Sequence, residues 1–421
     1  MSAESGSSSP LPELPPEIWL KIFRIATFIP HETELPAATF EQGFFCSHDQ
    51  LQILAFEAVL PLRRTIIHVS RRFYQIGAEV LYTTFHANTG VLKYPNRRLS
   101  RFSDLLVSRP ELGRFVKRLS LQWSDENEEK NYRIISRCPH VTIFSSFLPI
   151  TGIGDVPWWR RGLPKTIRCF DAVVLSVPMK DVMALLEMLP HLEMLLLYNL
   201  QGDSILHPPV RLSALRFLGV YAQNNEWYPP LLSTMRLPRL VALATNLGGV
   251  DAGLSLPLEV WRRLVHFEPS LRFYNGLRAD YFHNLRSLYL TVEPDSEINN
   301  ELHLRCFPFG QIEHLTLRIC PFFLAFTNWD KIIERVTVLP LDVETMPKLK
   351  LFQLAWGFKG IHVEHYKYPS CVVGKDRFIQ CLETAVTNFE QRGVLSVEID
   401  TQEICPGYQP VRDALTACKL S

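Results

Sequence analysis

The sequence predicts a mixed α/β protein in which a small helical module precedes a solenoid of short strands and helices. A proline-led helix near the start is apolar over too much of its circumference for an ordinary surface helix. A second apolar series at helical spacing follows it. The rest of the chain repeats one apolar pattern at nearly constant steps, which is typical of repeat architectures.

The first helix lies within Leu14 to Ala26, read as LPPEIWLKIFRIA. Pro16 suits the first helical turn, where its missing N–H would be unpaired anyway, and Glu17 lies where the helix dipole favours an anion. With successive residues about 100° apart, Glu17, Lys21 and Arg24 share a narrow polar arc. The apolar residues cover roughly 160° of the opposite side: Ile18, Trp19, Ile22, Phe23, Ile25 and Ala26. This excess of apolar surface predicts a partner, although the helix could also open an ordinary helical domain.

A second series of apolar residues, from Ile66 to Val80, lies in the basic stretch Thr65 to Phe85 and predicts two or three packed helices. Between the halves, residues 30–60 form an insertion. Within it, Gln50 to Leu60 could form a helix begun by Asp49 and ended by Pro61. The Ser-rich residues 1–13 are expected to be disordered, so the module spans 14–86 and the solenoid 87–421.

These two segments resemble the F-box, the helical module that connects a receptor to the adaptor of SCF-type cullin–RING ubiquitin ligases. The first half of the F-box pattern is matched by Leu14, Pro15, Glu17, Ile18, Ile22 and Phe23. The second half is matched by Val69, Ser70, Arg71 and Phe73, with Ser and Phe as substitutions. The insertion resembles the expanded F-box-like version of mushroom-forming fungi. The resemblance implies that the chain binds an adaptor and, through the adaptor, a cullin. The residues implied to contact the adaptor are Leu14, Pro15, Pro16, Glu17, Ile18, Trp19, Ile22, Phe23, Val69, Ser70 and Phe73.

The repeat is an apolar-x-x-apolar-x-apolar pattern long enough for one short strand. Its copies begin at residues 116, 141, 167, 192, 215, 240, 264, 285, 312 and 349. The steps are 25, 26, 25, 23, 25, 24, 21, 27 and 37 residues, and the longest contains an aromatic-rich bulge from Pro321 to Pro340. Several copies are entered by a proline two residues earlier: Pro139, Pro190, Pro238 and Pro347. The near-equal steps favour a repeat over an α/β domain without repeats.

This pattern resembles the degenerate leucine-rich repeats of F-box receptors, without their regular asparagine. It implies a right-handed horseshoe whose crossovers include a helix at Asp181 to Leu189, with Asp181 as its cap. A helix from Asp376 to Arg392 and a strand from Val394 to Ile399 are expected to close the solenoid.

A target protein would meet the concave face of such a solenoid. Positions one, four and six of each copy point into the core, so positions three, five and seven face the concave side. The resulting candidates are Met194, Leu196, Tyr198, Phe217, Tyr221, Tyr289, His314, Arg318, Leu351 and Gln353. Several belong to types that are energetically important at protein interfaces, although the long insertions or a second core could cover them.

Composition limits the function classes. The chain carries 44 Lys and Arg against 43 Asp and Glu, a net charge of +1, so neither nucleic acid nor an anionic membrane is an expected partner. No apolar run reaches the ~18 residues of a membrane span, and nine cysteines without CxxC spacing suggest reduced thiols. We therefore expect an intracellular protein, cytoplasmic or nuclear.

No enzyme motif is present: GxGxxG, GxxxxGK[ST], GxSxG and HExxH are all absent. His362, His365 and Cys371 could ligate a metal only if the chain folded back, and an exposed or structural role is favoured. The carboxylates from Asp125 to Glu129 are expected in a solvated loop. Trp158 and Trp159 could form a binding tip, although a packed insertion is favoured. We expect no catalytic residue, metal or cofactor.

The resemblance implies a non-catalytic substrate receptor that docks the adaptor through the helical module and a target through the solenoid. The main alternative is a leucine-rich-repeat interaction scaffold unconnected to ubiquitin transfer, in which the module only caps the solenoid. An enzyme of unrecognised type would require a constellation that the named residues do not form.

Overall fold

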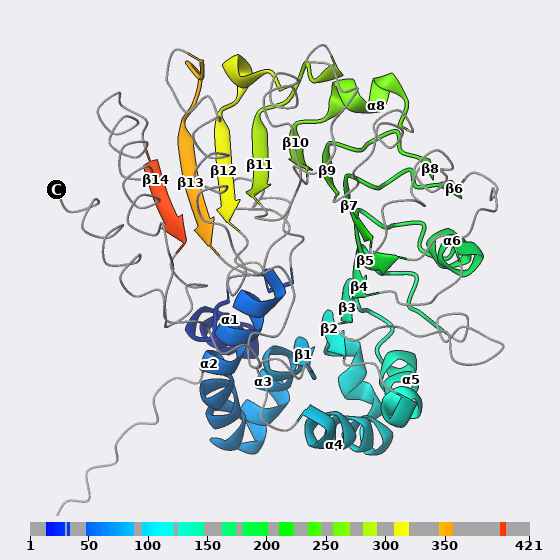
Figure 1. Cartoon of the computed structure of the whole chain (residues 1–421). Helices are drawn as coiled ribbons and strands as arrows, with labels where there is room; N and C mark the ends of the chain where they lie inside the picture. Colours follow the sequence, from blue (N-terminus) through cyan, green and yellow to red (C-terminus); the bar gives the residue numbers. More distant parts are fainter. Residues whose placement is uncertain are drawn as a thin grey trace, which may run out of the picture.

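The computed structural model describes residues 14–29, 32–33, 48–87, 95–121, 125–146, 162–173, 179–200, 210–222, 235–245, 256–269, 281–292, 307–319, 345–356 and 396–400. Within them, twelve parallel strands in chain order form one sheet that bends into an arc (Figure 1). Because every strand enters from the same edge, the chain must cross back once per repeat. The expected α/β solenoid is therefore confirmed.

The strands of this sheet are β1 Thr84–His86, β2 Arg118–Leu121, β3 Ile143–Ser146, β4 Cys169–Val173, β5 Met194–Leu200, β7 Phe217–Ala222, β9 Ala242–Thr245, β10 His266–Pro269, β11 Ser287–Val292, β12 His314–Ile319, β13 Leu351–Trp356 and β14 Ser396–Asp400. A separate pair consists of β6 Val210–Arg211 and β8 Met235–Arg236.

All ten repeat copies read from the sequence form strands. Each strand from β2 to β13 in the main sheet begins two residues after the first apolar position of its copy. Those first apolar side chains are buried, from Val116 at 0% exposed to Leu349 at 8%. They form one continuous core between the sheet and the helices that cover its outer face. The apolar spacing alone was thus enough to locate the strands.

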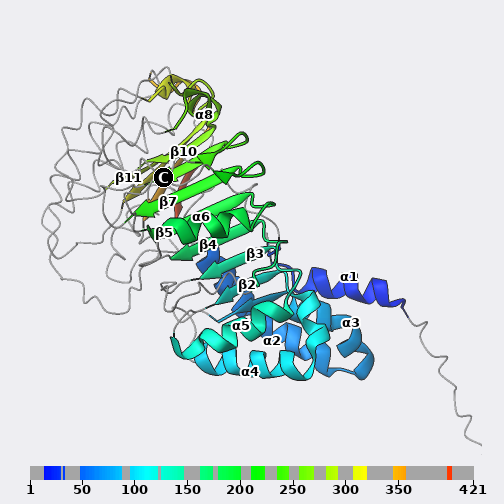
Figure 2. The ribbon, with the colours of Figure 1, turned by 90° about the vertical axis from the view of Figure 1, so that its right-hand side faces the viewer.

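Helices cover the outer face of the arc, as Figure 2 shows for α4 Pro95–Ser108, α5 Glu128–Arg137 and α6 Met179–Glu187. The shorter α8 Leu258–Arg263 and the 3₁₀ turns η3 Pro110–Phe115, η4 Asp125–Asn127 and η7 Phe309–Gln311 complete the described crossovers. At η3 the backbones come so close that a Cβ on Gly113 would lie 1.9 Å from the carbonyl oxygen of Arg137. Only glycine fits there.

The helical module contains α1 Pro16–Ala26, α2 His48–His68 and α3 Arg71–Tyr82. The first helix begins with Pro16, as expected, with Glu17 in its first turn. The prediction that Pro61 ends the second helix is wrong, because α2 continues through it to His68. Residues beyond the proline, Arg63 and Ile67, are buried, and their packing outweighs the hydrogen bond that proline cannot make. The break falls instead at Ser70, which caps α3 by accepting a hydrogen bond from the Phe73 N–H at 3.1 Å.

Three further expectations differ from the structure. Glu128 and Glu129 lie in the first turn of α5 and do not belong to a loop. The helix dipole stabilises carboxylates at this end of a helix. Asp181 lies inside the first turn of α6 because that helix begins at Met179. The strand β1 was not expected; it pairs with β2 and joins the helical module directly to the sheet. The expected helix at 376–392 and the bulge at 321–340 lie outside the described residues.

Candidate protein-binding surfaces

One face of α1 packs against α3 and fixes the helix in place. Trp19, Phe23 and Phe73 form a three-ring cluster with centroids 4.8 to 5.9 Å apart. An ion pair between Arg24 and Glu79 and a 3.1 Å hydrogen bond from the Arg72 Nη2 to the Leu14 carbonyl join the same two helices. Phe23 is 3% exposed, so it belongs to the core of the module and not to its surface.

The adjacent face of α1 is apolar and exposed. Leu14, Ile18, Ile22 and Ile25 are 39 to 68% exposed; the three isoleucines lie within about 60° of one another around the helix, and Leu14 lies two residues before its first turn. We call these four residues the α1 stripe. Two more apolar side chains of the module are exposed: Phe28 after the end of α1, 69% exposed, and Val69 between α2 and α3, 63% exposed. A monomer seldom aligns exposed branched side chains in this way without a partner.

The residues predicted to bind an adaptor therefore separate into two groups. Leu14, Pro15, Pro16, Glu17, Ile18, Ile22, Val69 and Ser70 are exposed on the module. Phe23 is buried, and Trp19 and Phe73 are partly buried against it. The prediction that Phe23 meets a partner is wrong, because its ring is used to attach α1 to α3. Ile25 and Phe28 join the exposed group, which the helical period could have indicated for Ile25 but not for Phe28.

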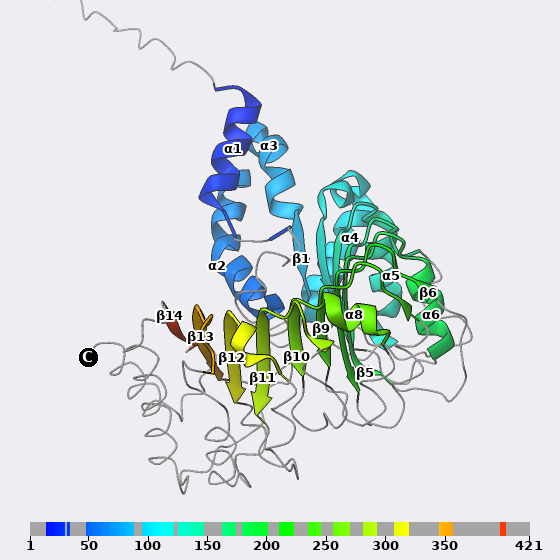
Figure 3. The same ribbon diagram turned by 90° about the horizontal axis from the view of Figure 1, so that it is seen from above.

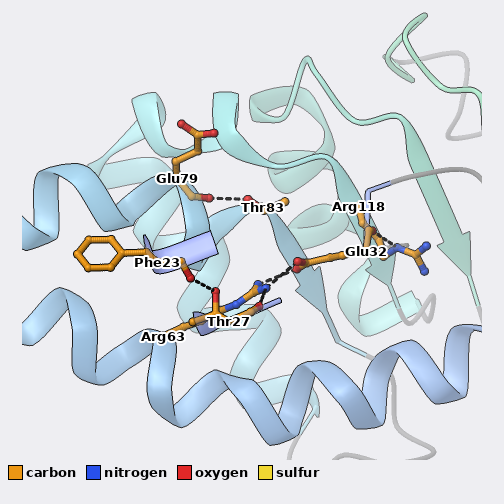
Figure 4. A network of polar contacts seen from close by, with 7 residues as sticks. All are labelled: Phe23, Thr27, Glu32, Arg63, Glu79, Thr83 and Arg118. Carbon is orange, nitrogen blue, oxygen red and sulfur yellow. Dashed lines mark hydrogen bonds and ion pairs between the residues drawn. The ribbon is translucent and has the colours of Figure 1, made fainter. Parts of the chain in front are cut away.

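A buried polar network connects the module to the solenoid (Figure 4). Arg63 from α2 donates from Nη1 and Nη2 to the two carboxylate oxygens of Glu32, both at 2.6 Å, and to the Thr27 carbonyl at 3.0 Å. Arg118, the first residue of β2, donates from Nε to the Glu32 carbonyl at 2.9 Å. The segment after α1 is thereby held between α2 and the first repeat. Such connections keep the α1 stripe at a fixed position relative to the sheet.

The same junction buries His86 completely, between the Phe56 ring at 5.1 Å and the charges of three arginines. Neither of its ring nitrogens has a hydrogen-bond partner among the described residues. Desolvation, followed by the charges of Arg118, Arg98 and Arg63, lowers the pKa of His86 well below its usual 6.5. His86 is therefore neutral in the folded protein at physiological pH.

Acidification is expected to destabilise the protein through His86. Below a pH of about 6.5 the unfolded chain takes up a proton at this residue and the folded chain does not. Stability is therefore complete above that pH and falls by about 1.4 kcal/mol per pH unit below it. His266, whose pKa desolvation and the charge of His314 lower to about 4, adds a similar slope between about 6.5 and 4. Urea unfolding at several pH values should show a shallower slope for His86→Phe than for the parent; equal slopes would contradict the assignment.

The residues predicted to bind a target on the concave face differ in their exposure. Met194, Leu196 and Phe217 are 1 to 4% exposed and form a second buried cluster with Ile143, Cys169, Ala242 and Ala244. Tyr289 is 5% exposed. These four side chains are not accessible, so the second core considered from the sequence is present here. His314 and Leu351 are partly exposed, and the side chains of Tyr198, Tyr221, Arg318 and Gln353 lie outside the described residues.

The strand register explains this unevenness. A single row across the sheet runs through Ile143, Cys169, Met194, Phe217 and Ala242, and then through His266, Ser287, His314 and Leu351. The first part of the row is apolar and buried, whereas His266, Ser287 and His314 are partly exposed. Among the described strands, the accessible polar groups on this face are therefore in the later repeats, apart from the partly exposed Asp171 of β4.

No three described His, Cys, Asp or Glu residues cluster as metal ligands. His362, His365 and Cys371 lie outside the described part of the chain, as do Trp158 and Trp159. Of the helices that the structure describes, none has the length and apolar character that crossing a bilayer requires.

No family model and no curated protein matches the sequence. Among solved structures, the chain is similar to a protein from Bacteroides fragilis, with 14% identity and a TM-score of 0.33 over 75% of this chain and 85% of that one. It is also similar to the leucine-rich repeat-containing protein LegL7 from Legionella pneumophila, with 11% identity and a TM-score of 0.32 over 75% and 86% of the two chains. Both likenesses are weak, and the repeat architecture rests on the parallel strand order of the chain itself.

Proposed function

We propose that this chain is a non-catalytic substrate receptor of an SCF-type ubiquitin ligase. In this role α1, α2 and α3 act as an F-box-like module for the adaptor, and the solenoid holds a target protein. The observation that carries the proposal is the α1 stripe. It lies in the segment that resembles the F-box, on a helix whose adjacent face is already fixed to α3.

The stripe is large enough to support binding. Transferring an Ile or Leu side chain fully from water into an apolar groove contributes roughly 1.5–3 kcal/mol. Because the four stripe residues are already partly buried, each would contribute less than that upper value. Their sum must still exceed the entropy lost on association, which a rigid helix reduces. A partner with an apolar groove would therefore recognise α1 without any further ordering of the module.

A receptor of this kind needs no acid, base or metal of its own. Holding a lysine of the target near a charged thioester raises its effective concentration, and this effect depends on rigidity and distance. The buried network of Arg63, Glu32 and Arg118 supplies such rigidity between the module and the first repeat.

The proposal predicts that Ile18→Glu, Ile22→Glu abolishes binding of the purified SCF adaptor to the full chain. Two carboxylates would enter an apolar groove, while the fold should survive because both side chains are about 40% exposed. Val107→Glu, Leu258→Glu is the matched control, since these residues are 49 and 38% exposed on α4 and α8. Adaptor retained by the control and lost by the stripe variant supports the proposal. Failure of the parent to bind, or equal binding by all three, overturns it.

The second candidate function is an interaction scaffold in which the module only caps the solenoid. It is favoured by Ala78 of α3, which is part of the main core, and by β1, which extends the sheet beyond the first repeat. Burial of Phe23 against α3 also suits a cap. Capping explains why α2 and α3 are present, but it gives no reason for an exposed apolar stripe on α1.

A further inference from the structure

The edge at which the strands begin has an unusual charge. We define the amino-terminal rim as the five residues that precede each main-sheet strand from β2 to β13. Because these strands are parallel and adjacent in chain order, their preceding turns lie side by side along one edge of the arc. All of these turns lie within the described residues.

The rim is strongly basic although the chain as a whole is nearly neutral, with 44 basic and 43 acidic residues. Its basic residues are Arg114, Lys117, Lys165, Arg168, Arg216, Arg239, Arg262, Arg263, Arg286, Lys348 and Lys350. Its only acidic residues are Glu193 and Glu313. Nine of the eleven basic side chains are exposed, and Lys117 and Arg263 are partly exposed. The remaining chain therefore has an excess of acidic residues, and the opposite charges are segregated.

Internal ion pairs account for only part of this charge. Glu193 binds Arg168 at 2.6 Å, and Glu313 binds Lys350 at 2.6 Å and Arg286 at 3.1 Å. The hydrogen bond from Lys350 in particular lowers the pKa of Glu313, which keeps that carboxylate ionised. Within the described part of the chain, Lys165, Arg239, Arg262 and Lys348 take part in no ion pair. Such a row of exposed cations without counter-charges attracts anionic partners.

We propose that the amino-terminal rim is a docking surface for an acidic protein segment, a stretch of chain rich in Asp and Glu. Successive turns are spaced by the separation of neighbouring strands, about 4.8 Å. An extended peptide lying across the strand ends can therefore place carboxylates near one turn after another. It can also follow the curvature of the arc that Figure 1 shows.

Other anionic partners fit this surface less well. Single-stranded nucleic acids stack on exposed aromatic rings, but of the Phe and Trp rings in the rim, Trp261, Phe282 and Phe309 are buried and Phe115 is only partly exposed. A DNA duplex has a persistence length of about 500 Å, so bending it along the arc would cost free energy that a flexible peptide does not lose. A flat membrane is obstructed because α1, α2 and α3 project beyond the rim on the side where the strands begin (Figure 3).

The test uses the full chain and a fluorescein-labelled oligoglutamate peptide, with binding followed by fluorescence anisotropy at low and moderate salt. The rim variant is Arg239→Glu, Arg262→Glu, Lys348→Glu. The control is Arg64→Glu, Arg97→Glu, Arg101→Glu, which changes the net charge equally at exposed sites on α2 and α4. We expect the parent to bind, the rim variant to bind at least about tenfold more weakly, and the control to bind like the parent. Added salt should weaken binding.

Equal losses in the rim and control variants would overturn the proposal, because net charge alone would then explain binding. No binding by the parent at low salt would overturn it too. So would tighter binding to a DNA duplex of equal formal charge, or to vesicles containing phosphatidylserine. The α1 stripe is unchanged in every variant, so this proposal and adaptor binding can fail independently.

Discussion

Phe23→Ala is expected to free α1 from α3 while the solenoid stays folded. Truncating a buried Phe costs about 3–5 kcal/mol, because both the transfer energy and the packing around the cavity are lost. Here the loss falls on one contact, the cluster with Trp19 and Phe73, which attaches α1 to the rest of the module. Local opening of α1 should therefore become at least a hundredfold more frequent. Hydrogen exchange of the peptide covering residues 16–26, followed by mass spectrometry, measures this directly.

The matched control is Ile22→Ala, one residue away on the same helix. Ile22 is 40% exposed, so its truncation should change exchange in α1 little. Both variants should weaken adaptor binding, but for different reasons: Ile22→Ala removes a contact, and Phe23→Ala removes the rigid presentation of the stripe. Strong exchange protection of α1 in Phe23→Ala would show that the ring cluster does not hold the helix.

The sequence predicts the helical period of α1, but it does not predict which of its apolar residues pack against α3 and which stay exposed. The pattern gave one wide apolar surface from Ile18 to Ala26. Which part is buried depends on where α3 lies, and that is fixed by Phe73 and by the cap at Ser70. An excess of apolar surface indicates two contacts, one with the rest of the module and one with a partner, but it does not assign residues to either of them.

The solenoid was the most predictable part, since each repeat must bury the same apolar positions against its neighbours. The run of α2 through Pro61 was not predictable from local rules, because the buried side chains of Arg63 and Ile67 follow from tertiary packing. The accessible part of the concave face was also missed. Alternation gives the direction of a side chain, but Met194 and Phe217 are buried by their surroundings.

The rim shows how a net charge can mislead. A value of +1 excluded anionic partners only if the charges were mixed over the surface. The sequence already contained the signal: basic residues recur just before the strands, as in Arg168, Arg216, Arg286 and Lys350. Counting charge by repeat position, instead of over the whole chain, would have located the rim.

Arg63→Ala is expected to destabilise the junction between module and solenoid by about 3–5 kcal/mol, the usual cost of removing one partner from a buried ion pair. The Arg63 side chain is 2% exposed and the Glu32 side chain 13% exposed. Without Arg63, the Glu32 carboxylate would lose two 2.6 Å hydrogen bonds, and little water could reach it to replace them. The Thr27 carbonyl and the Phe56 face would each lose a contact as well. Urea unfolding followed by circular dichroism gives the change in unfolding free energy.

The double variant Arg63→Met, Glu32→Gln separates charge from packing. With both charges gone, no ion is left unpaired in the junction, so this variant should be more stable than Arg63→Ala. A double variant as unstable as Arg63→Ala would mean that the ion pair and its hydrogen bonds are themselves a net stabilisation, because Met restores most of the space that Ala leaves empty. If the ion pair instead sets how the module joins the first repeat, Arg63→Ala should also raise hydrogen exchange in the segment after α1 and in β2, where Arg118 meets Glu32. The α1 stripe would remain intact but no longer hold a fixed position relative to the sheet. A receptor that works by proximity would then bind its adaptor and still deliver its target poorly, because rigid spacing is its contribution to the reaction.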